Sequence, residues 1–214
     1  MASNEKKPEC KRGVLIGEGN SGRIFKMDNK IVKKVFKNKK FFEAELNILE
    51  KIKGSKYIVK IHKIDKQNNT LFMEYIPYNL ECIINGKYNK KLYQFNKNKI
   101  AIELLLGLKS LHNNNIVHND FKAKNIQVTD NSTIKIIDFD SSDFNLKTSN
   151  KKIEDINKAK IIILQLINKR SFNHTFKNRF NYIDNIKEDK FKDVMTLNRN
   201  NLTELINYLN KNNF

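Results

Sequence analysis

The sequence predicts an α+β fold in a single domain of two lobes, a β-rich small lobe over residues 12–76 and a reduced helical large lobe over residues 77–214. In the first part, short apolar runs alternate with turn residues, a pattern typical of antiparallel strands. In the second part, apolar residues recur every three or four positions over 97–113 and 154–167, which indicates helices. A chain of 214 residues with 39% hydrophobic content can bury one sizeable core.

The small lobe is predicted to begin with a glycine-rich hairpin. Its strands cover 14–16, 23–27 and 30–36, with glycines at 17, 19 and 22 between the first two. A dinucleotide-binding fold would place a helix after glycines at this spacing. Here the turn Asp28-Asn29 joins two strands instead. The glycines are therefore expected to let backbone N–H groups approach phosphate oxygens from a β-hairpin.

The remaining predicted elements are one helix and two strands in the small lobe, then helices. The first helix covers 41–52, the strands cover 57–64 and 70–73, and Pro77 prevents the last strand from continuing. Residues 79–98 are polar and rich in Asn and Lys, and no regular element is predicted there. Residues 169–214 offer two helices, the last marked by Leu202, Leu205, Ile206 and Leu209.

The composition favours some partners over others. The net charge is +18, which attracts nucleic acid and acidic proteins alike. The basic residues are nearly all Lys, with Arg at only five positions, as an AT-rich genome would encode whatever the function. Specific phosphate recognition usually recruits Arg for its fork geometry. Nucleic acid is therefore a possible but unspecific partner, and an acidic protein substrate is favoured over it.

No feature of the sequence predicts export or a membrane. No run of about 18 apolar residues is present, and the polar start lacks the apolar core of a signal peptide. Met1-Ala2 also lacks the glycine that myristoylation needs. The only two cysteines, Cys10 and Cys82, are expected to be free thiols. We therefore expect a cytoplasmic protein with no membrane partner, and the oligomeric state is left open.

One stretch carries the parts that phosphoryl transfer needs. It runs from His118 to Ile126, and short strands over 126–128 and 133–137 then lead to Asp138. The reaction requires a carboxylate near the substrate hydroxyl, a carboxylate and an amide oxygen for Mg²⁺, and a lysine near the transferred group. The candidates are Asp120 as the catalytic base, Asp138 and Asn125 as metal ligands, and Lys122 as the lysine.

This arrangement resembles the catalytic and metal-binding loops of the protein kinase superfamily. The family pattern reads His-Arg-Asp-x-Lys-x-x-Asn and later Asp-Phe-Gly, and the interval from Asp120 to Asp138, 18 residues (138 minus 120), is also similar. The resemblance covers roughly residues 13–168. It implies a bilobal kinase fold, ATP and Mg²⁺ as cofactors, and protein substrates.

The resemblance also implies which residues contact the nucleotide. They are Gly17, Glu18, Gly19, Asn20, Ser21, Gly22, Ile24, Ile31, Lys33, Glu45, Met73, Glu74, Tyr75 and Gln127. Among them, Met73 matches the gatekeeper before the hinge, and Glu45 matches the helical glutamate that pairs with the lysine of the third strand.

That lysine is Lys33 or Lys34, and the strand register decides between them. A two-residue turn at Asp28-Asn29 would place Ile24 opposite Lys33, and residues directly opposite share a sheet face. In the resembled family the position of Ile24 roofs the nucleotide. Lys33 is therefore preferred, with Ile31 on the same face, and a longer turn would reverse the choice to Lys34.

The sequence departs from the family pattern after Asp138. Asp140 replaces the glycine, no Ala-Pro-Glu follows, and Asp155, which resembles the aspartate that braces the catalytic loop, comes only 17 residues (155 minus 138) after Asp138. Asn119 replaces the arginine that binds an activating phosphate. These departures predict activity without phosphorylation, and the added carboxylate of Asp140 predicts tolerance of Mn²⁺. Minimal kinases of large DNA viruses are similarly reduced, which would place the protein in host cytoplasm or nucleus.

Three functions remain open at this point. The first is a serine/threonine protein kinase, favoured by Lys122, the glycine hairpin and the Met-Glu-Tyr hinge. The second is a small-molecule kinase resembling the aminoglycoside and choline phosphotransferases, which lack the same segment and often carry an acid like Asp140. The third is a kinase-shaped binding module without strong activity, which the reduced large lobe would suit. The physiological substrate, the source and the role of 169–214 are not indicated by the sequence.

Overall fold

The computed structural model describes residues 13–87, 95–144, 149–168 and 201–211. These residues form two compact units. The first contains residues 13–42 and 60–75, and the second contains residues 43–59 and the described residues from 76 onward. Residues 43–59, which the sequence analysis counted with the small lobe, thus cluster with the second unit. Helix α1 (Lys39–Lys51) begins in the first unit and continues in the second.

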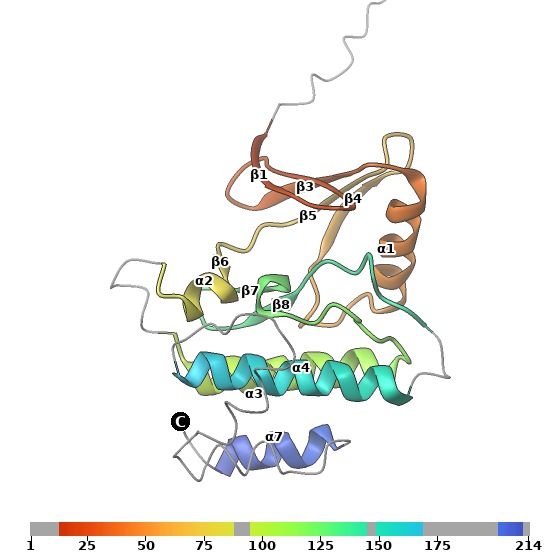
Figure 1. The fold of residues 1–214 in the computed structure, drawn as a ribbon. Helices are drawn as coiled ribbons and strands as arrows, with labels where there is room; N and C mark the ends of the chain where they lie inside the picture. The colour runs from red at the N-terminus through yellow and green to blue at the C-terminus, as the bar shows by residue number, and fades with distance from the viewer. Residues whose placement is uncertain (1–12, 88–94, 145–148, 169–200, 212–214) are drawn as a thin grey trace, which may run out of the picture. The chain divides into compact units, whose positions relative to one another are not determined.

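The first unit is an antiparallel five-stranded sheet (Figure 1). Its strands are β1 (Val14–Glu18), β2 (Gly22–Lys26), β3 (Ile31–Phe36), β4 (Ile61–Asp65) and β5 (Thr70–Glu74), in the order β1-β2-β3-β5-β4. Alternate residues of β3 are buried, as expected for a strand with one face covered. Phe36 from that face meets the Phe42 ring edge-on at a centroid distance of 5.7 Å. The sheet therefore has a defined apolar face.

The predicted register between β2 and β3 is wrong by one residue. Ile24 pairs with Lys34 and Phe25 with Lys33. The cause is the turn, because the Asp28 carboxylate accepts hydrogen bonds from the N–H groups of Lys30 (2.6 Å) and Ile31 (2.8 Å). This side-chain turn is longer than the two residues assumed. It moves Lys33 and Ile31 to the face opposite Ile24 and brings Lys34 and Val32 to the face of Ile24.

Two other predicted boundaries are corrected by the second unit. The strand predicted over 57–64 begins only at Ile61, because Tyr57 and Val59 bond to β8 (Ile134–Ile136) instead. Between Pro77 and Gly86 the chain forms β6 (Tyr78–Asn79) and helix α2 (Leu80–Ile84), which were not predicted. The Asn79 side chain caps α2 by accepting the Glu81 N–H, so an N-cap inside the polar run was the signal missed.

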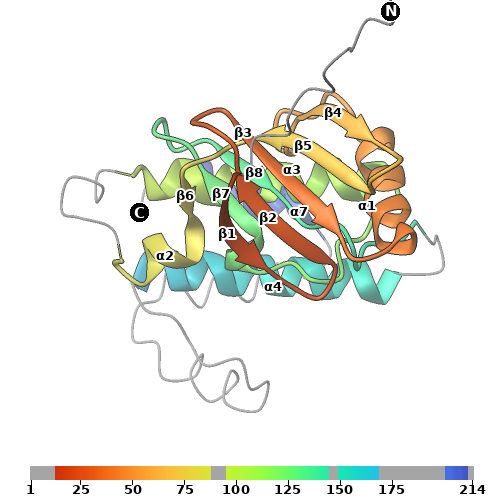
Figure 2. The same cartoon turned by 90° about the horizontal axis from the view of Figure 1, so that it is seen from above.

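The second unit combines a three-stranded sheet with three longer helices (Figures 1 and 2). The sheet order is β6-β7-β8, with β7 spanning Ile126–Val128. The helices are α3 (Lys97–Asn113), α4 (Ser149–Asn168) and α7 (Leu202–Lys211). Helix α3 packs against both α4 and α7, and the side chains of Ile100, Leu104, Leu105, Leu108 and Leu111 on it are buried. This packing holds the end of α3, and the loop that contains Asp120 follows it.

The predicted helices are confirmed with small differences. Helix α3 has the predicted limits, with the Asn96 side chain as its N-cap. Helix α4 begins at Ser149, earlier than the predicted Glu154. The predicted stripe of α7 is buried, whereas the other predicted helix of the tail, in 169–200, lies outside the described residues. Cys82 is a free thiol as predicted, whereas Cys10 is not among the described residues. None of the described helices combines the length and apolarity needed to cross a membrane.

Candidate active site

Two predicted catalytic residues, Asp120 and Lys122, meet the predicted metal ligand Asn125 in one loop of the second unit. The loop leaves α3 and ends in a short 3₁₀ turn (Ala123–Asn125). The Asn125 amide nitrogen donates to the backbone oxygen and to Oδ2 of Asp120, each at 3.0 Å. The Lys122 Nζ lies 2.6 Å from the same Oδ2. Asp120 is thus held between an amide and an ammonium group, and its carboxylate is still 37% exposed and accessible to a substrate.

Asp138 is brought to this loop by β8 and the residues after it. The Ile137 N–H donates to the Asn125 carbonyl at 3.0 Å, so the two predicted metal ligands come from neighbouring backbone segments. Asp138 itself has a left-handed φ of 67°, which a non-glycine residue adopts only when its surroundings impose it.

The residues present fit a divalent cation. Because the NH₂ end of Asn125 is turned to Asp120, its Oδ1 end is turned away from it. An amide oxygen and a carboxylate oxygen are ligands that Mg²⁺ accepts, with substrate phosphate and water oxygens completing its shell. The described residues contain no group of three or more His, Cys, Asp or Glu side chains that could hold a metal alone. A cation held by Asn125 and Asp138 would need further oxygen ligands, such as phosphate and water oxygens.

His118 forms the buried base of the loop. It is fully buried and lies against the rings of Phe121 and Phe139, at centroid distances of 5.6 and 5.1 Å. Burial lowers the pKa of the imidazole, and the neighbouring Asp155 and other groups only partly offset this. Its Nε2 lies 3.2 Å from the Ile137 carbonyl, which can only accept, so Nε2 carries the proton. His118 thereby ties the loop to the strand that leads to Asp138.

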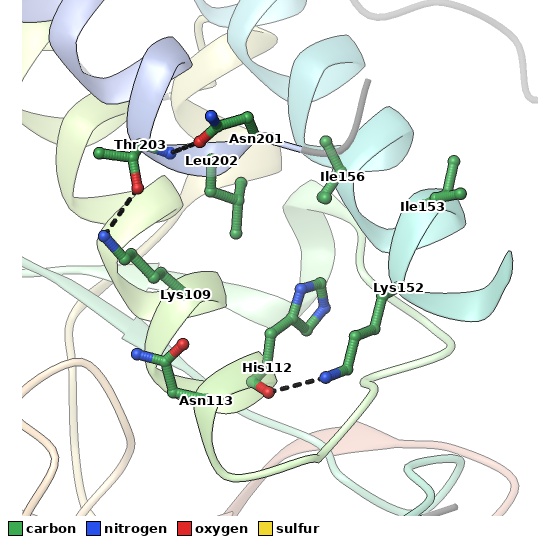
Figure 3. A pocket seen from close by; sticks show the side chains of 9 residues that line it. All are labelled: Lys109, His112, Asn113, Lys152, Ile153, Ile156, Asn201, Leu202 and Thr203. Atoms are coloured by element: carbon green, nitrogen blue, oxygen red, sulfur yellow. Dashed lines mark hydrogen bonds between the residues drawn. The ribbon is translucent and has the colours of Figure 1, made fainter. Parts of the chain in front are cut away.

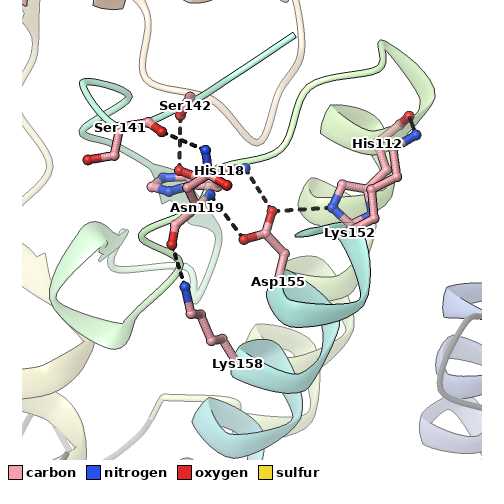
Figure 4. Close-up of polar contacts among 8 residues, drawn as sticks. All are labelled: His112, His118, Asn119, Ser141, Ser142, Lys152, Asp155 and Lys158. Carbon is pink, nitrogen blue, oxygen red and sulfur yellow. Dashed lines mark hydrogen bonds and ion pairs between the residues drawn. The ribbon is translucent and has the colours of Figure 1, made fainter. Parts of the chain in front are cut away.

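Asp155 braces the loop from α4, as predicted (Figure 4). Its fully buried carboxylate accepts the N–H groups of His118 at 2.7 Å and of Asn119 at 3.1 Å. The His112 Nε2 lies 3.4 Å from the same carboxylate. A second α4 residue, Lys158, donates to the Asn119 carbonyl. Lys158 was not predicted from the sequence, although its spacing from Asp155 places both on one helical face.

His112 also lines a cavity (Figure 3). The cavity has a volume of about 390 Å³ and is lined by the end of α3, the start of α4 and the start of α7. Its lining includes Lys109, which bonds to Thr203 at 2.9 Å, and Lys152, which bonds to the His112 carbonyl at 2.9 Å. None of the predicted site residues lines it, so this cavity is separate from the candidate active site.

The hairpin predicted to cover the phosphates lies in the first unit. Gly19 N–H donates to the Gly22 carbonyl at 2.9 Å, which closes the turn between β1 and β2. Glu18 forms an exposed ion pair with Arg23 at 3.0 Å, Asn20 is exposed and Ser21 is buried. Glu18 is thus engaged within the hairpin.

The corrected register changes which lysine is the candidate for the phosphates. Lys34 is 4% exposed and shares the face of Ile24, whereas the Lys33 Nζ lies 5.1 Å from the centre of the Phe25 ring on the other face. Because the phosphate lysine is expected on the sheet face of Ile24, Lys34 replaces Lys33 as the candidate. Val32, two residues before it, likewise replaces Ile31.

The predicted hinge residues end β5. Met73 is buried and pairs with Val32 and Ile61. The N–H groups of Glu74 and Tyr75 are bonded to the carbonyls of Lys60 (3.0 Å) and Lys30 (2.7 Å). In a backbone hydrogen bond with a nucleotide base, these two residues would therefore act as acceptors through their carbonyl groups.

Two predicted nucleotide residues lie in the second unit. Glu45 is 1% exposed on α1, and Gln127 lies in the central strand β7 between Asn79 and Lys135. Their contacts with a nucleotide, and the pairing of Glu45 with a β3 lysine, stay predictions.

Comparisons with known proteins agree with this geometry. A model of the protein kinase domain matches residues 10–158, more than half of the chain. The chain is 32% identical over 138 residues to cyclin-dependent kinase F-3 of Oryza sativa, covering 58% of this chain and 31% of that protein. It is 26% identical over 168 residues to extracellular signal-regulated kinase 2 of Dictyostelium discoideum, covering 71% and 43%.

A third relative is the serine/threonine-protein kinase STK11 of Gallus gallus, 27% identical over 143 residues, covering 59% of this chain and 32% of that protein. The chain spans less than half the length of each of these three relatives. The domain match and the constellation around Asp120 together show that this chain belongs to the protein kinase family.

Proposed function

We propose that this protein is an ATP- and Mg²⁺-dependent serine/threonine protein kinase that is active without an activating phosphorylation. The observation that carries the proposal is the position of Lys122 and Asn125 around the Asp120 carboxylate, at 2.6 and 3.0 Å. A chain that kept only the kinase shape would have no need to hold these three polar groups together while leaving the carboxylate accessible. Family membership supports the same conclusion.

Each residue has a distinct role in the proposed reaction. Asp120 orients the substrate hydroxyl and accepts its proton, and Lys122 stabilises negative charge on the transferred phosphoryl group. Asn125 and Asp138 would hold the cation, which when bound neutralises charge on the phosphate oxygens. Lys34 would contact the nucleotide phosphates. Catalysis then rests on positioning and electrostatics, since phosphoryl transfer requires little covalent chemistry from the protein.

Lys122 and the relatives support serine and threonine as acceptors. Lysine two residues after the catalytic aspartate is the choice of the resembled Ser/Thr kinases, and STK11, one of the relatives, is named as a serine/threonine kinase. The net charge of +18 favours an acidic protein as the substrate.

A panel assay tests the function. The purified chain is offered radiolabelled ATP with an acidic protein, a basic protein or a mixture of small alcohols, and Asp138→Asn serves as the blank. We expect label on Ser and Thr of the acidic protein, and none with Asp138→Asn. Transfer to the small alcohols alone would show a small-molecule kinase, which the short segment after Asp138 and the acid at Asp140 would suit. If no acceptor is labelled, the result would favour the third function, a kinase-shaped binding module without strong activity.

The same assay tests the metal. Asp140 adds a carboxylate two residues after Asp138, and the Ser141 hydroxyl donates to it at 3.0 Å. We expect activity with Mn²⁺ as well as Mg²⁺, because a further oxygen ligand widens the range of cations accepted. The control is Asp140→Gly, and a ratio of Mn²⁺ to Mg²⁺ activity unchanged in that variant would show that Asp140 takes no part.

A further inference from the structure

Asn119, directly before the catalytic Asp120, is held on every side. Its φ of 64° is in the left-handed region, which single Asn residues adopt where local hydrogen bonds hold them. Its N–H donates to Asp155 at 3.1 Å, and its side-chain amide donates to the Ser141 carbonyl at 2.7 Å. Its carbonyl accepts from the Lys158 ammonium (Figure 4). These three contacts hold both the backbone and the side chain of Asn119 in one conformation.

The carbonyl held by Lys158 belongs to the peptide that connects Asn119 to Asp120. Peptide groups are planar, so fixing this carbonyl also fixes the direction of the Asp120 N–H on the other side of the same plane. That N–H donates to the His118 carbonyl at 2.8 Å. Lys158 thus acts on the backbone at Asp120, although it does not contact the Asp120 carboxylate in the described contacts.

We infer that Lys158 is a positioning residue for catalysis, a role that rests on the proposed kinase function. Asp155 and Lys158 are three residues apart on α4, so one rigid helix supplies an anion for the loop N–H groups and a cation for its carbonyl. A hydrogen bond from a charged donor is stronger than one between neutral groups. The catalytic loop is therefore fixed by a cation within the chain, at the residue where the family pattern has a phosphate-binding arginine and this chain has Asn119.

The test compares Lys158→Met, which removes the ammonium, with Lys158→Arg, which keeps a charged donor. We expect Lys158→Met to lower kcat about tenfold or more, because a small displacement of a catalytic group is costly, and to leave the KM for ATP unchanged. Lys158→Arg should restore most of the lost kcat. The matched control is Lys151→Met on the same helix, whose ion pair with Asp143 is exposed, and it should keep wild-type kcat.

Each outcome of this experiment is decisive. A wild-type kcat in Lys158→Met, with an active wild-type protein, would overturn the inference and leave the kinase function standing. An inactive wild-type protein would instead contradict the kinase function itself. If Lys158→Met does not fold, Lys158→Gln replaces it, since its neutral amide can still donate. A kcat for Lys158→Gln between those of Lys158→Arg and the Asp138→Asn blank would support the role, and one equal to wild type would overturn it.

Discussion

Lys33 and Lys34 are adjacent, chemically identical and on opposite faces of β3, so they form a matched pair for mutation. We predict that Lys34→Met removes most kinase activity, by about 10²–10³ in rate as for other lost charge-stabilising donors. Lys33→Met should keep activity near the wild-type level. The measurement is kcat for both variants beside their circular dichroism, since Met preserves the length and apolar stem of the buried side chain. Loss of activity in Lys33→Met alone would show that Lys33, and not Lys34, is the lysine that the reaction needs.

His118 gives a prediction for stability against pH. Burial holds its pKa in the folded protein below the usual 6.5. The unfolded chain therefore takes up a proton near pH 6.5 that the folded chain does not, so folding stability falls as pH decreases below that value. The loss is at most about 1.4 kcal/mol per pH unit for one proton.

Urea unfolding at pH 7.5 and pH 5.5 tests this prediction. Wild type should lose more free energy of unfolding over this interval than His118→Gln, in which no imidazole titrates at that position. Equal losses in the two proteins would show that His118 is protonated as readily in the folded state as in the unfolded chain.

At the scale of elements, the glycines of the β1–β2 hairpin serve different purposes. A Cβ atom on Gly22 would lie 2.3 Å from the Val35 carbonyl oxygen, so the close approach of β2 to β3 requires glycine there. A Cβ atom on Gly17 would make an ordinary contact of 3.8 Å with Ile24. A Cβ atom on Gly19 would meet no described atom within 4 Å. The backbone at Gly19 is therefore open to an approaching ligand.

We therefore predict opposite results for two alanine variants. Gly22→Ala should reduce the free energy of unfolding by about 1–3 kcal/mol, as overpacking does. Gly19→Ala should change it by less than about 0.5 kcal/mol, as at other uncrowded sites, but should raise the KM for ATP severalfold. Thermal unfolding and ATP kinetics of both variants check this. An unchanged KM in Gly19→Ala would mean that phosphates do not approach the hairpin at this residue.

The sequence predicted elements whose local signals agree with their packing. Helix α3 was predicted from its apolar periodicity with its observed limits, and the structure adds the Asn96 side chain as the N-cap directly before it. The stretch from Asp120 to Asn125 was predictable because one short loop supplies all its groups. The role of Asp155 followed from the family resemblance, and the structure confirmed it.

Features set by a single side chain or by distant segments were not predictable in the same way. The hairpin register depended on whether the Asp28 carboxylate accepts two backbone N–H groups, and this changed the assignment of Lys33. Tyr57 and Val59 join β8, more than 70 residues away in sequence, in place of a longer β4. Lys158 has no motif, and only the three-dimensional position of the Asn119 carbonyl reveals it.

At the scale of the whole molecule, regulation follows from how the residues after Asp138 are held. Val117 and Asp143 form a reciprocal pair of backbone hydrogen bonds at 3.0 Å. The Ser142 hydroxyl donates to the His118 carbonyl at 3.2 Å, and the Asn119 side chain donates to the Ser141 carbonyl. Residues 141–143 are thus attached to the catalytic loop by neutral hydrogen bonds. A phosphate is not needed for these contacts, and one placed on Ser142 would remove the hydroxyl that makes one of them.

The final prediction is therefore that the kinase is active as synthesised. In the resembled family, an arginine before the catalytic aspartate binds a phosphate that orders the activation segment. Asn119 has no charge to pair with phosphate, and Lys158 already donates to its carbonyl. We expect protein made in bacteria to have equal specific activity before and after phosphatase treatment, with mass spectrometry confirming removal of phosphate. A drop of tenfold or more, about 1.4 kcal/mol of barrier, would show that a phosphorylated residue orders the site after all.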